Sequence, residues 1–109
     1  MSGWRKPRAA SAAERIDPMR TIHKYTLLPG RLKVQMPKGA KVLTAREQID
    51  DVCVWAEVDT TAPKEIRVFE VFGTGQAIPQ GMGMEWRYVG TAHLEGGALV
   101  FHVYEYLGT

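Results

Sequence analysis

The sequence predicts an all-β fold, an antiparallel sandwich or small barrel of about seven strands with a flexible N-terminal tail. Apolar and polar residues alternate with a period of two from Thr21 onward, which is typical of half-buried strands. Turns rich in glycine and proline separate the alternating runs, and no run shows the period of a long helix. A chain of 109 residues has room for one hydrophobic core. We therefore expect residues 1–19 to form a flexible basic tail and residues 20–109 a single all-β domain.

The N-terminal tail holds the basic excess of the chain. Residues 1–18 combine Ser, Gly, Pro, Ala and Arg without sustained apolar periodicity, so they bury too little surface to offset the entropy of ordering. The net charge is +2, and residues 1–20 contribute five basic and two acidic residues, or +3, which leaves −1 for the remainder. The charge balance is therefore weak evidence for a nucleic-acid partner. Met19 is a candidate alternative start.

The clearest strand runs from Arg31 to Met36. Its alternation places Leu32, Val34 and Met36 on one face, and turn residues flank it on both sides. Six further runs complete the predicted sheet: Thr21 to Leu27, Lys41 to Gln48, Val52 to Val58, Glu65 to Phe72, Trp86 to Leu94, and Ala98 to Tyr106.

The pattern defines some of these segments more firmly than others. Lys41 to Gln48 is compatible with a strand or with the opening of a helical turn. The last two runs are joined by Glu95-Gly96-Gly97, and a Gly-Gly turn between two β-rich runs predicts a hairpin. Residues 76–85 carry one proline and two glycines, which favours an irregular surface loop.

The residues that could take part in catalysis or metal binding do not form a recognisable catalytic pattern. His23, His93 and His102 invite a metal hypothesis, and the predicted hairpin puts the last two on one sheet face, but zinc sites need three or four ligands and no standard spacing is present. Cys53 lies in an apolar run, which predicts a small buried hydrophobe, and a single cysteine forms no internal disulfide. Asp50-Asp51 is explained by a turn. We therefore expect no enzyme activity, no cofactor and no metal.

Three features are candidates for binding. The Gly73-Thr74-Gly75 turn could hold an anion on its amides, although a turn or bulge in which glycine relieves backbone strain is the favoured explanation. The following loop carries exposed apolar residues that could contact a partner, or could pack locally. Lysines and arginines near aromatic residues could form a basic stacking face, or belong to a mixed solvated surface: Lys24, Lys33, Lys41, Arg46 and Arg67, with Tyr25, Trp55 or Trp86. The candidate ligand or partner contacts are His23, Lys24, Arg67, Gly73, Thr74, Gly75, Met82, Met84 and Trp86.

Six short motifs in consistent order resemble a widespread family of small phage and prophage proteins of unknown function. The resemblance covers residues 19–105 and implies a phage or prophage origin and a start near Met19. It brings no established activity, so it assigns no functional residue. The motifs are Thr21-Ile22-His23-Lys24-Tyr25, Met36-Pro37-Lys38-Gly39-Ala40, Val54-Trp55-Ala56, Phe72-Gly73-Thr74-Gly75 with Ile78-Pro79, Tyr88-Val89-Gly90-Thr91, and Val100-Phe101-His102-Val103-Tyr104-Glu105.

These observations predict a small phage-encoded, non-enzymatic binding module in the host cytoplasm. Its partner would be a host protein or a small anionic ligand, and inhibition of a host defence component, such as a CRISPR complex or a nucleotide signal, fits such a module. Two alternatives stay open: a nucleic-acid-binding β-barrel, whose affinity would fall steeply with salt, and a minor virion or assembly protein. An unpaired strand edge would also permit a homodimer. No segment is apolar enough to predict a membrane span.

Overall fold

The computed structural model describes residues 19–108, and these form a single sheet of seven strands. The prediction of an all-β fold is confirmed, and no helix in this part of the chain is long and apolar enough to cross a membrane. The prediction of a flexible tail covers residues 1–19, of which residues 1–18 lie outside the described residues. Met19 is described, and its carbonyl accepts a hydrogen bond from the Thr60 amide at 2.9 Å. The strands are β1 (Arg20–Leu27), β2 (Gly30–Pro37), β3 (Lys41–Gln48), β4 (Asp51–Asp59), β5 (Lys64–Gly73), β6 (Glu85–Leu94) and β7 (Leu99–Gly108).

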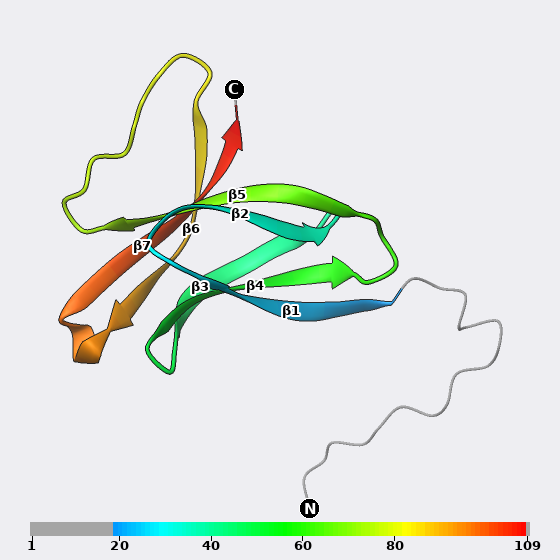
Figure 1. The fold of residues 1–109 in the computed structure, drawn as a ribbon, viewed down its shortest axis with the longest axis horizontal. Coiled ribbons are helices and arrows are strands. Elements are labelled where there is room, and N and C mark those ends of the chain that lie inside the picture. The colour runs from blue at the N-terminus through cyan, green and yellow to red at the C-terminus, as the bar shows by residue number, and fades with distance from the viewer. Residues whose placement is uncertain (1–18, 109) are drawn as a thin grey trace, which may run out of the picture.

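The sheet consists of two antiparallel groups joined by one parallel contact. The strand order is β1-β4-β3-β6-β7-β5-β2, so β1 and β2 lie at opposite ends although only Leu28 and Pro29 separate them in the chain. This short connection brings the two ends together, and the sheet coils into a nearly closed barrel (Figure 1). We call β1-β4-β3 the three-stranded half and β6-β7-β5-β2 the four-stranded half. The sequence predicted antiparallel pairing only, and the parallel β3–β6 contact departs from that expectation.

The joint between the halves depends on one glycine. Ala45 of β3 pairs with Gly90 of β6, and a β-carbon at position 90 would overlap the Ala45 carbonyl oxygen and lie 2.8 Å from its amide nitrogen. Side chains extend the joint beyond this point: Glu47 accepts a hydrogen bond from the His93 amide at 2.9 Å. That hydrogen bond, then one from the backbone of Glu47 itself and a smaller effect of Arg46, lower the pKa of Glu47. At this joint, one close backbone contact and the Glu47 carboxylate take the place of a regular series of backbone hydrogen bonds between strands.

The core lies on the inward face of the coiled sheet. In β4 the predicted inward residues Val52, Val54, Ala56 and Val58 are all buried, and Cys53 on the opposite face is the one residue that departs from alternating burial. The predicted inward face of β2 is confirmed as well: Met36 is fully buried, and Leu32 and Val34 pack against the core from partly buried positions. Cys53 is buried and free, as expected.

Two local predictions can be compared with the backbone. Lys41–Gln48 is a strand rather than a helical turn, and the bend after it is made by Ile49 and Asp50, both with positive φ. The hairpin between β6 and β7 is confirmed, but a 3₁₀ turn over Glu95–Gly97 closes it in place of a two-residue turn, with the Ala98 amide donating to the Glu95 carbonyl at 3.2 Å. Both glycines of that turn have positive φ, which explains their use there.

Candidate functional site

A groove lies on the outward face of the four-stranded half, where β5 ends beside β7. It has a volume of about 260 Å³ and combines aromatic, hydroxyl and backbone surface. The Gly73-Thr74-Gly75 turn forms one wall because Gly75, with a φ of 90°, reverses the chain immediately after β5. The lining residues are Phe72, Gly73, Thr74, Gly75, Gln76, Ile78, His102 and Tyr104.

A chain of hydrogen bonds crosses this surface from the turn to β6. The Nε2 atom of His102 lies 2.8 Å from the Thr74 hydroxyl, and its Nδ1 atom lies 3.2 Å from the Thr91 hydroxyl. Thr91 in turn lies 2.5 Å from the phenol oxygen of Tyr88. Both ring nitrogens of His102 therefore face hydroxyl groups, which fixes the orientation of the ring.

Aromatic rings continue the surface next to the groove. Tyr104 packs edge-on against Phe72 and Tyr88, with ring centroids 5.8 and 5.4 Å apart. Trp86 contacts Phe72 at 5.6 Å and Tyr106 at 4.9 Å. These rings lie together because alternating positions of β6 and β7 project to the same face. We call the groove together with these rings and residues 76–84 the groove surface.

The loop before β6 is tied to the rings on one side and exposed on the other. The indole N–H of Trp86 donates to the Pro79 carbonyl at 3.0 Å, which holds the loop against the sheet and helps to cover Phe72, itself 2% exposed. Met82 at the tip is fully exposed. Met84 lies closer to the sheet and is partly buried. Of the predicted contacts, Gly73, Thr74 and Gly75 line the groove, Trp86 packs against Phe72 in its lining, and Met82 and Met84 lie on the loop that connects the turn to β6.

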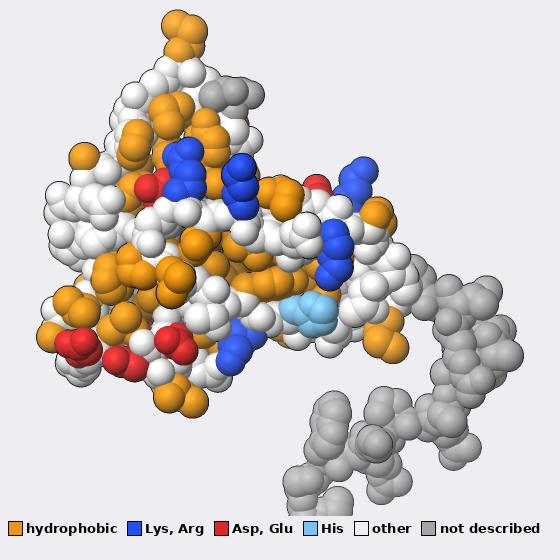
Figure 2. Space-filling view, viewed as in Figure 1, with side chains coloured by type: hydrophobic (Ala, Val, Ile, Leu, Met, Phe, Trp, Pro, Cys, Tyr) orange, Lys and Arg blue, Asp and Glu red, His pale blue; other side chains and the backbone are white. Residues whose placement is uncertain are grey.

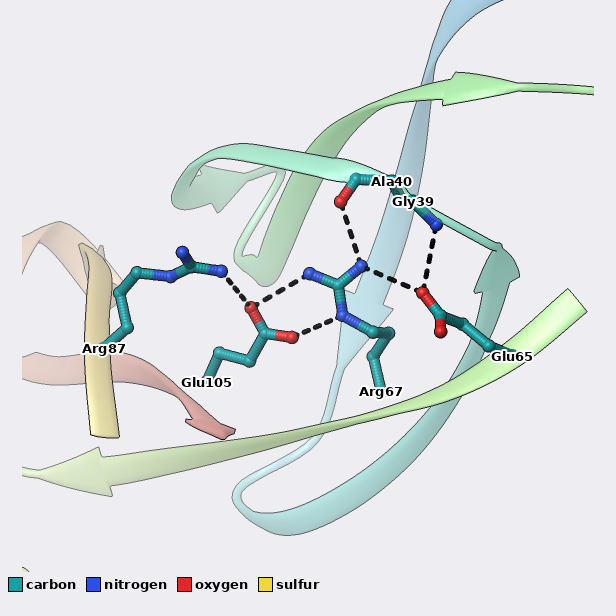
Figure 3. Close-up of polar contacts among 6 residues, drawn as sticks. All are labelled: Gly39, Ala40, Glu65, Arg67, Arg87 and Glu105. Carbon is teal, nitrogen blue, oxygen red and sulfur yellow. Dashed lines mark hydrogen bonds and ion pairs between the residues drawn. The ribbon is translucent and has the colours of Figure 1, made fainter. Parts of the chain in front are cut away.

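Arg67 lies elsewhere, in a cluster of charged residues on the inward face (Figure 3). It donates two hydrogen bonds to Glu105, at 2.5 and 3.2 Å, and a third to the Ala40 carbonyl at 2.9 Å. Arg87 donates to the same carboxylate at 2.9 Å, and Glu65 approaches Arg67 at 3.6 Å. These contacts tie β5, β6, β7 and the turn after β2 to one another.

The cluster keeps Glu105 ionised although its side chain is only 3% exposed. Burial by itself raises the pKa of this carboxyl, but the hydrogen bonds from Arg67 and Arg87 outweigh burial, so the pKa lies below its ordinary value. The hydrogen bond to Glu105 likewise raises the pKa of Arg67. Because the donors of Arg67 point into the protein, a structural role accounts for them, and its predicted contact with a ligand stays a prediction.

His23 and Lys24 lie on β1, away from the groove. The His23 ring meets Tyr25 edge-on at 6.3 Å, and the Lys24 ammonium donates to the Gln48 side chain at 2.6 Å. The β1–β4 and β3–β4 registers place Lys24 and Arg46 on the same outward face as Trp55. The predicted basic face therefore exists in part, on the three-stranded half.

Sequence reasoning missed the roles of three residues in the groove surface. Tyr88, Thr91 and Tyr104 were named only as parts of family motifs, and the only chemical role considered for His102 was that of a metal ligand. The alternation of residues 98–106 does place His102, Tyr104 and Tyr106 on one face. The pattern contains no sign that this face is outward, because its residues are as apolar as those facing the core.

The fold and site define a nearly closed β-barrel that carries an aromatic groove on one outward face. Among the described residues, no group of three or more His, Cys, Asp or Glu side chains is placed to hold a metal ion. The sequence matches the model of a domain of unknown function, DUF7352, over residues 19–108, and the chain belongs to this family. No curated protein and no solved structure matches it. The resemblance to an uncharacterised family is thereby confirmed at the level of the domain.

Proposed function

We propose that this protein is a phage-encoded, non-enzymatic module that binds a host protein through the groove surface. The observation that carries the proposal is the groove with its aromatic rim, together with the adjoining loop, which Trp86 ties to the rim through Pro79 and which carries the fully exposed Met82. Aromatic and methionine side chains are enriched in protein interfaces because they supply large contact areas. In a phage setting, a component of host defence is the partner class we favour.

The chemistry of the groove favours a protein over a small anionic ligand. None of its lining residues is a lysine or arginine. Two amides of the turn already have acceptors: the Gly73 amide donates to the Gln76 side chain at 3.1 Å, and the Thr74 amide donates to the Val100 carbonyl at 3.4 Å. A nucleotide phosphate would therefore find no lysine or arginine in the groove, whereas an apolar side chain with one hydrogen-bonding group would meet Tyr104 and His102.

The hydrogen bonding of His102 supports binding rather than catalysis. General acid–base catalysis by histidine commonly uses a carboxylate on one ring nitrogen and a reacting proton on the other. Here two threonine hydroxyls, of Thr74 and Thr91, occupy those positions. The ring is held as part of a contact surface.

Capture from phage-infected host cells tests the proposal, with Met82→Asp compared against the wild-type protein. Ile49→Asp is the matched control, because Ile49 is 93% exposed and lies on the β3–β4 turn of the other half. We expect Met82→Asp to lose a host protein that both the wild type and Ile49→Asp retain. A host protein retained equally by all three would contradict the role of the groove surface.

The basic face around Trp55 supports a second candidate, binding of single-stranded nucleic acid. Lys24 and Arg46 flank this tryptophan across the strands, and an indole beside cations is a platform on which bases stack. Such binding would weaken steeply with salt and would be lost in Trp55→Ala. Failure to bind oligonucleotides at low salt would exclude it.

A further inference from the structure

The two edge strands do not pair with each other in the part of the chain that the structure describes. Among the described residues, β1 pairs only with β4 and β2 only with β5, so each has one edge whose amides and carbonyls have no partner strand. The coiled sheet brings these two free edges to the same side of the molecule (Figure 1). We call the strip of surface between these two edges the seam. An unpaired edge is a template for a further strand.

The floor of the seam is apolar. Tyr25 from β1 and Leu32 and Val34 from β2 are only partly buried and pack against the core. Burial raises the pKa of the Tyr25 phenol, consistent with a desolvated position. Hydrophobic side chains fill the middle of this side of the molecule between the two edge strands (Figure 2). A strand lying there would gain backbone pairing at its edge and apolar contacts below.

The charges of the two edge strands are all of one sign. Strand β1 contains Arg20 and Lys24, strand β2 contains Arg31 and Lys33, and neither contains an acidic residue. Neighbouring strands neutralise two of the four: Arg20 pairs with Glu57 at 3.0 Å and Arg31 with Glu70 at 3.1 Å. Lys24 contacts a neutral glutamine. After these ion pairs, one exposed lysine remains on each border of the seam: Lys24 on β1, whose ammonium lies toward Gln48, and Lys33 on β2.

We propose that the seam accepts an extended, acidic segment of a partner protein as an added strand. The free edges supply the backbone pairing, the apolar floor takes the inward side chains, and the basic borders select acidic outward side chains. This surface is separate from the groove surface, so the inference does not rest on the proposed function. It also gives a role to the predicted contacts His23 and Lys24, which lie on β1.

Charge argues against two other occupants. A second copy would place β1 or β2 against a strand of the same sign, and like charges directly opposite are destabilising. The N-terminal segment of the same chain is also basic, since residues 1–18 hold four arginines or lysines against two acidic residues. An acidic partner is the occupant that complements the borders.

A pair of synthetic peptides provides the test. Each is as long as β1, eight residues, and alternates valine with either glutamate or lysine. Backbone amide signals of the full-length protein are followed by NMR during titration. We expect the glutamate peptide to shift amides of β1 and β2 and to lose affinity as salt rises, and the lysine peptide to leave them unchanged.

Two double variants locate the contact. Lys24→Glu with Lys33→Glu should weaken binding of the glutamate peptide at least about tenfold, because it reverses the charge of both borders. Lys41→Glu with Arg46→Glu, on β3, should change it less than about twofold. Met82→Asp should leave it unchanged, which separates this result from the test of the groove surface.

Three outcomes would overturn the inference. Equal shifts with both peptides would remove the role of charge, and shifts confined to the groove surface would move the contact elsewhere. A stable dimer of the free protein, with β1 or β2 protected at its interface, would show that a second copy occupies the seam.

Discussion

The two halves of the sheet hold themselves together by different means. The inward side of β4, in the three-stranded half, presents only aliphatic side chains, and Val54, Ala56 and Val58 are fully buried. The inward side of the four-stranded half is apolar at one end and carries Arg67 and Glu105 at the other. Aliphatic contacts stabilise without direction, whereas the charged cluster fixes which strand positions face each other.

This difference shows which half contains the contacts that specify strand register. A buried ion pair adds little net stability over an apolar pair of the same size, but removing one partner is costly because a buried charge is left alone. The four-stranded half also carries the groove surface on its other side. We infer that the cluster holds β5, β6 and β7 in the register that assembles the aromatic rings beside the groove. Single substitutions can disturb one half, or the joint between the halves, at a time.

Gly90→Ala should have the largest effect on stability, because it introduces a steric clash at the joint between the halves. The added methyl would overlap backbone atoms of Ala45, which have no flexible side chain to move aside. We expect a loss of more than about 3 kcal/mol in the free energy of unfolding, measured by urea denaturation.

Gly73→Ala is the control for that variant. It also lies in a strand, and its nearest contact would be a Phe101 side-chain carbon at an ordinary 3.9 Å. We expect it to change the free energy of unfolding by less than about 1 kcal/mol. Equal losses in the two variants would show that the close β3–β6 approach is not what Gly90 serves.

Glu105→Gln should destabilise the four-stranded half. It leaves the guanidinium of Arg67, whose side chain is 15% exposed, without the carboxylate that accepts two of its hydrogen bonds. We expect a loss of about 3 kcal/mol in the free energy of unfolding. A loss below about 1 kcal/mol, by the same urea titration, would mean that the cluster is dispensable.

Acid should weaken the same cluster. The pKa of Glu105 is lower in the folded protein than in the unfolded chain, so its contribution is complete above the unfolded value of about 4.3 and is lost as pH falls through the folded value. Melting curves between neutral pH and about pH 3 should show a smaller drop for Glu105→Gln than for the wild type. Some drop should remain, because Glu47 and Asp59 also have lowered pKa values.

Val54→Ala separates acid sensitivity from general weakening. It removes two methyl groups from the three-stranded half without touching a charge, so its melting temperature should lie below that of the wild type by a similar amount at every pH. If the melting temperature of Glu105→Gln also differed from that of the wild type by a similar amount at every pH, the proposed role of Glu105 in acid sensitivity would be contradicted.

Arg31→Ala should have the smallest effect. Arg31 lies over the rings of Trp86 and Tyr106, at 5.7 and 5.0 Å from their centroids, and pairs with Glu70, but its side chain is half exposed. We expect a loss of about 1 kcal/mol, seen as a drop of a few degrees in melting temperature. Lys33→Ala, on the same face of β2, is the matched control and should melt close to the wild type.

The sequence predicted the strands well because their alternation and turns are local. Residues 31–36 and 52–58 show which positions share a face, and the structure agrees. The parallel β3–β6 contact was beyond that reasoning, because nothing near Gly90 indicates a close backbone partner 45 residues away. Arg67 and Glu105 were similarly hidden: a charge within an alternating run predicts an outward position, and only the fold shows two charges paired inside.

The candidate site was predicted in part for the same reason. The Gly73-Thr74-Gly75 turn and Trp86 were found from local composition. His102 joined them only through the β5–β7 register, which pairs it with Phe72. Such non-local contacts leave no mark in one sequence.

Hydrogen–deuterium exchange on the partner-bound protein tests the central claim most directly, namely that this barrel acts through contacts made by the four-stranded half. We predict slower exchange in residues 72–88 and 100–106 on binding, and unchanged exchange in β3 and β4. Protection confined to β3 and β4 would contradict it.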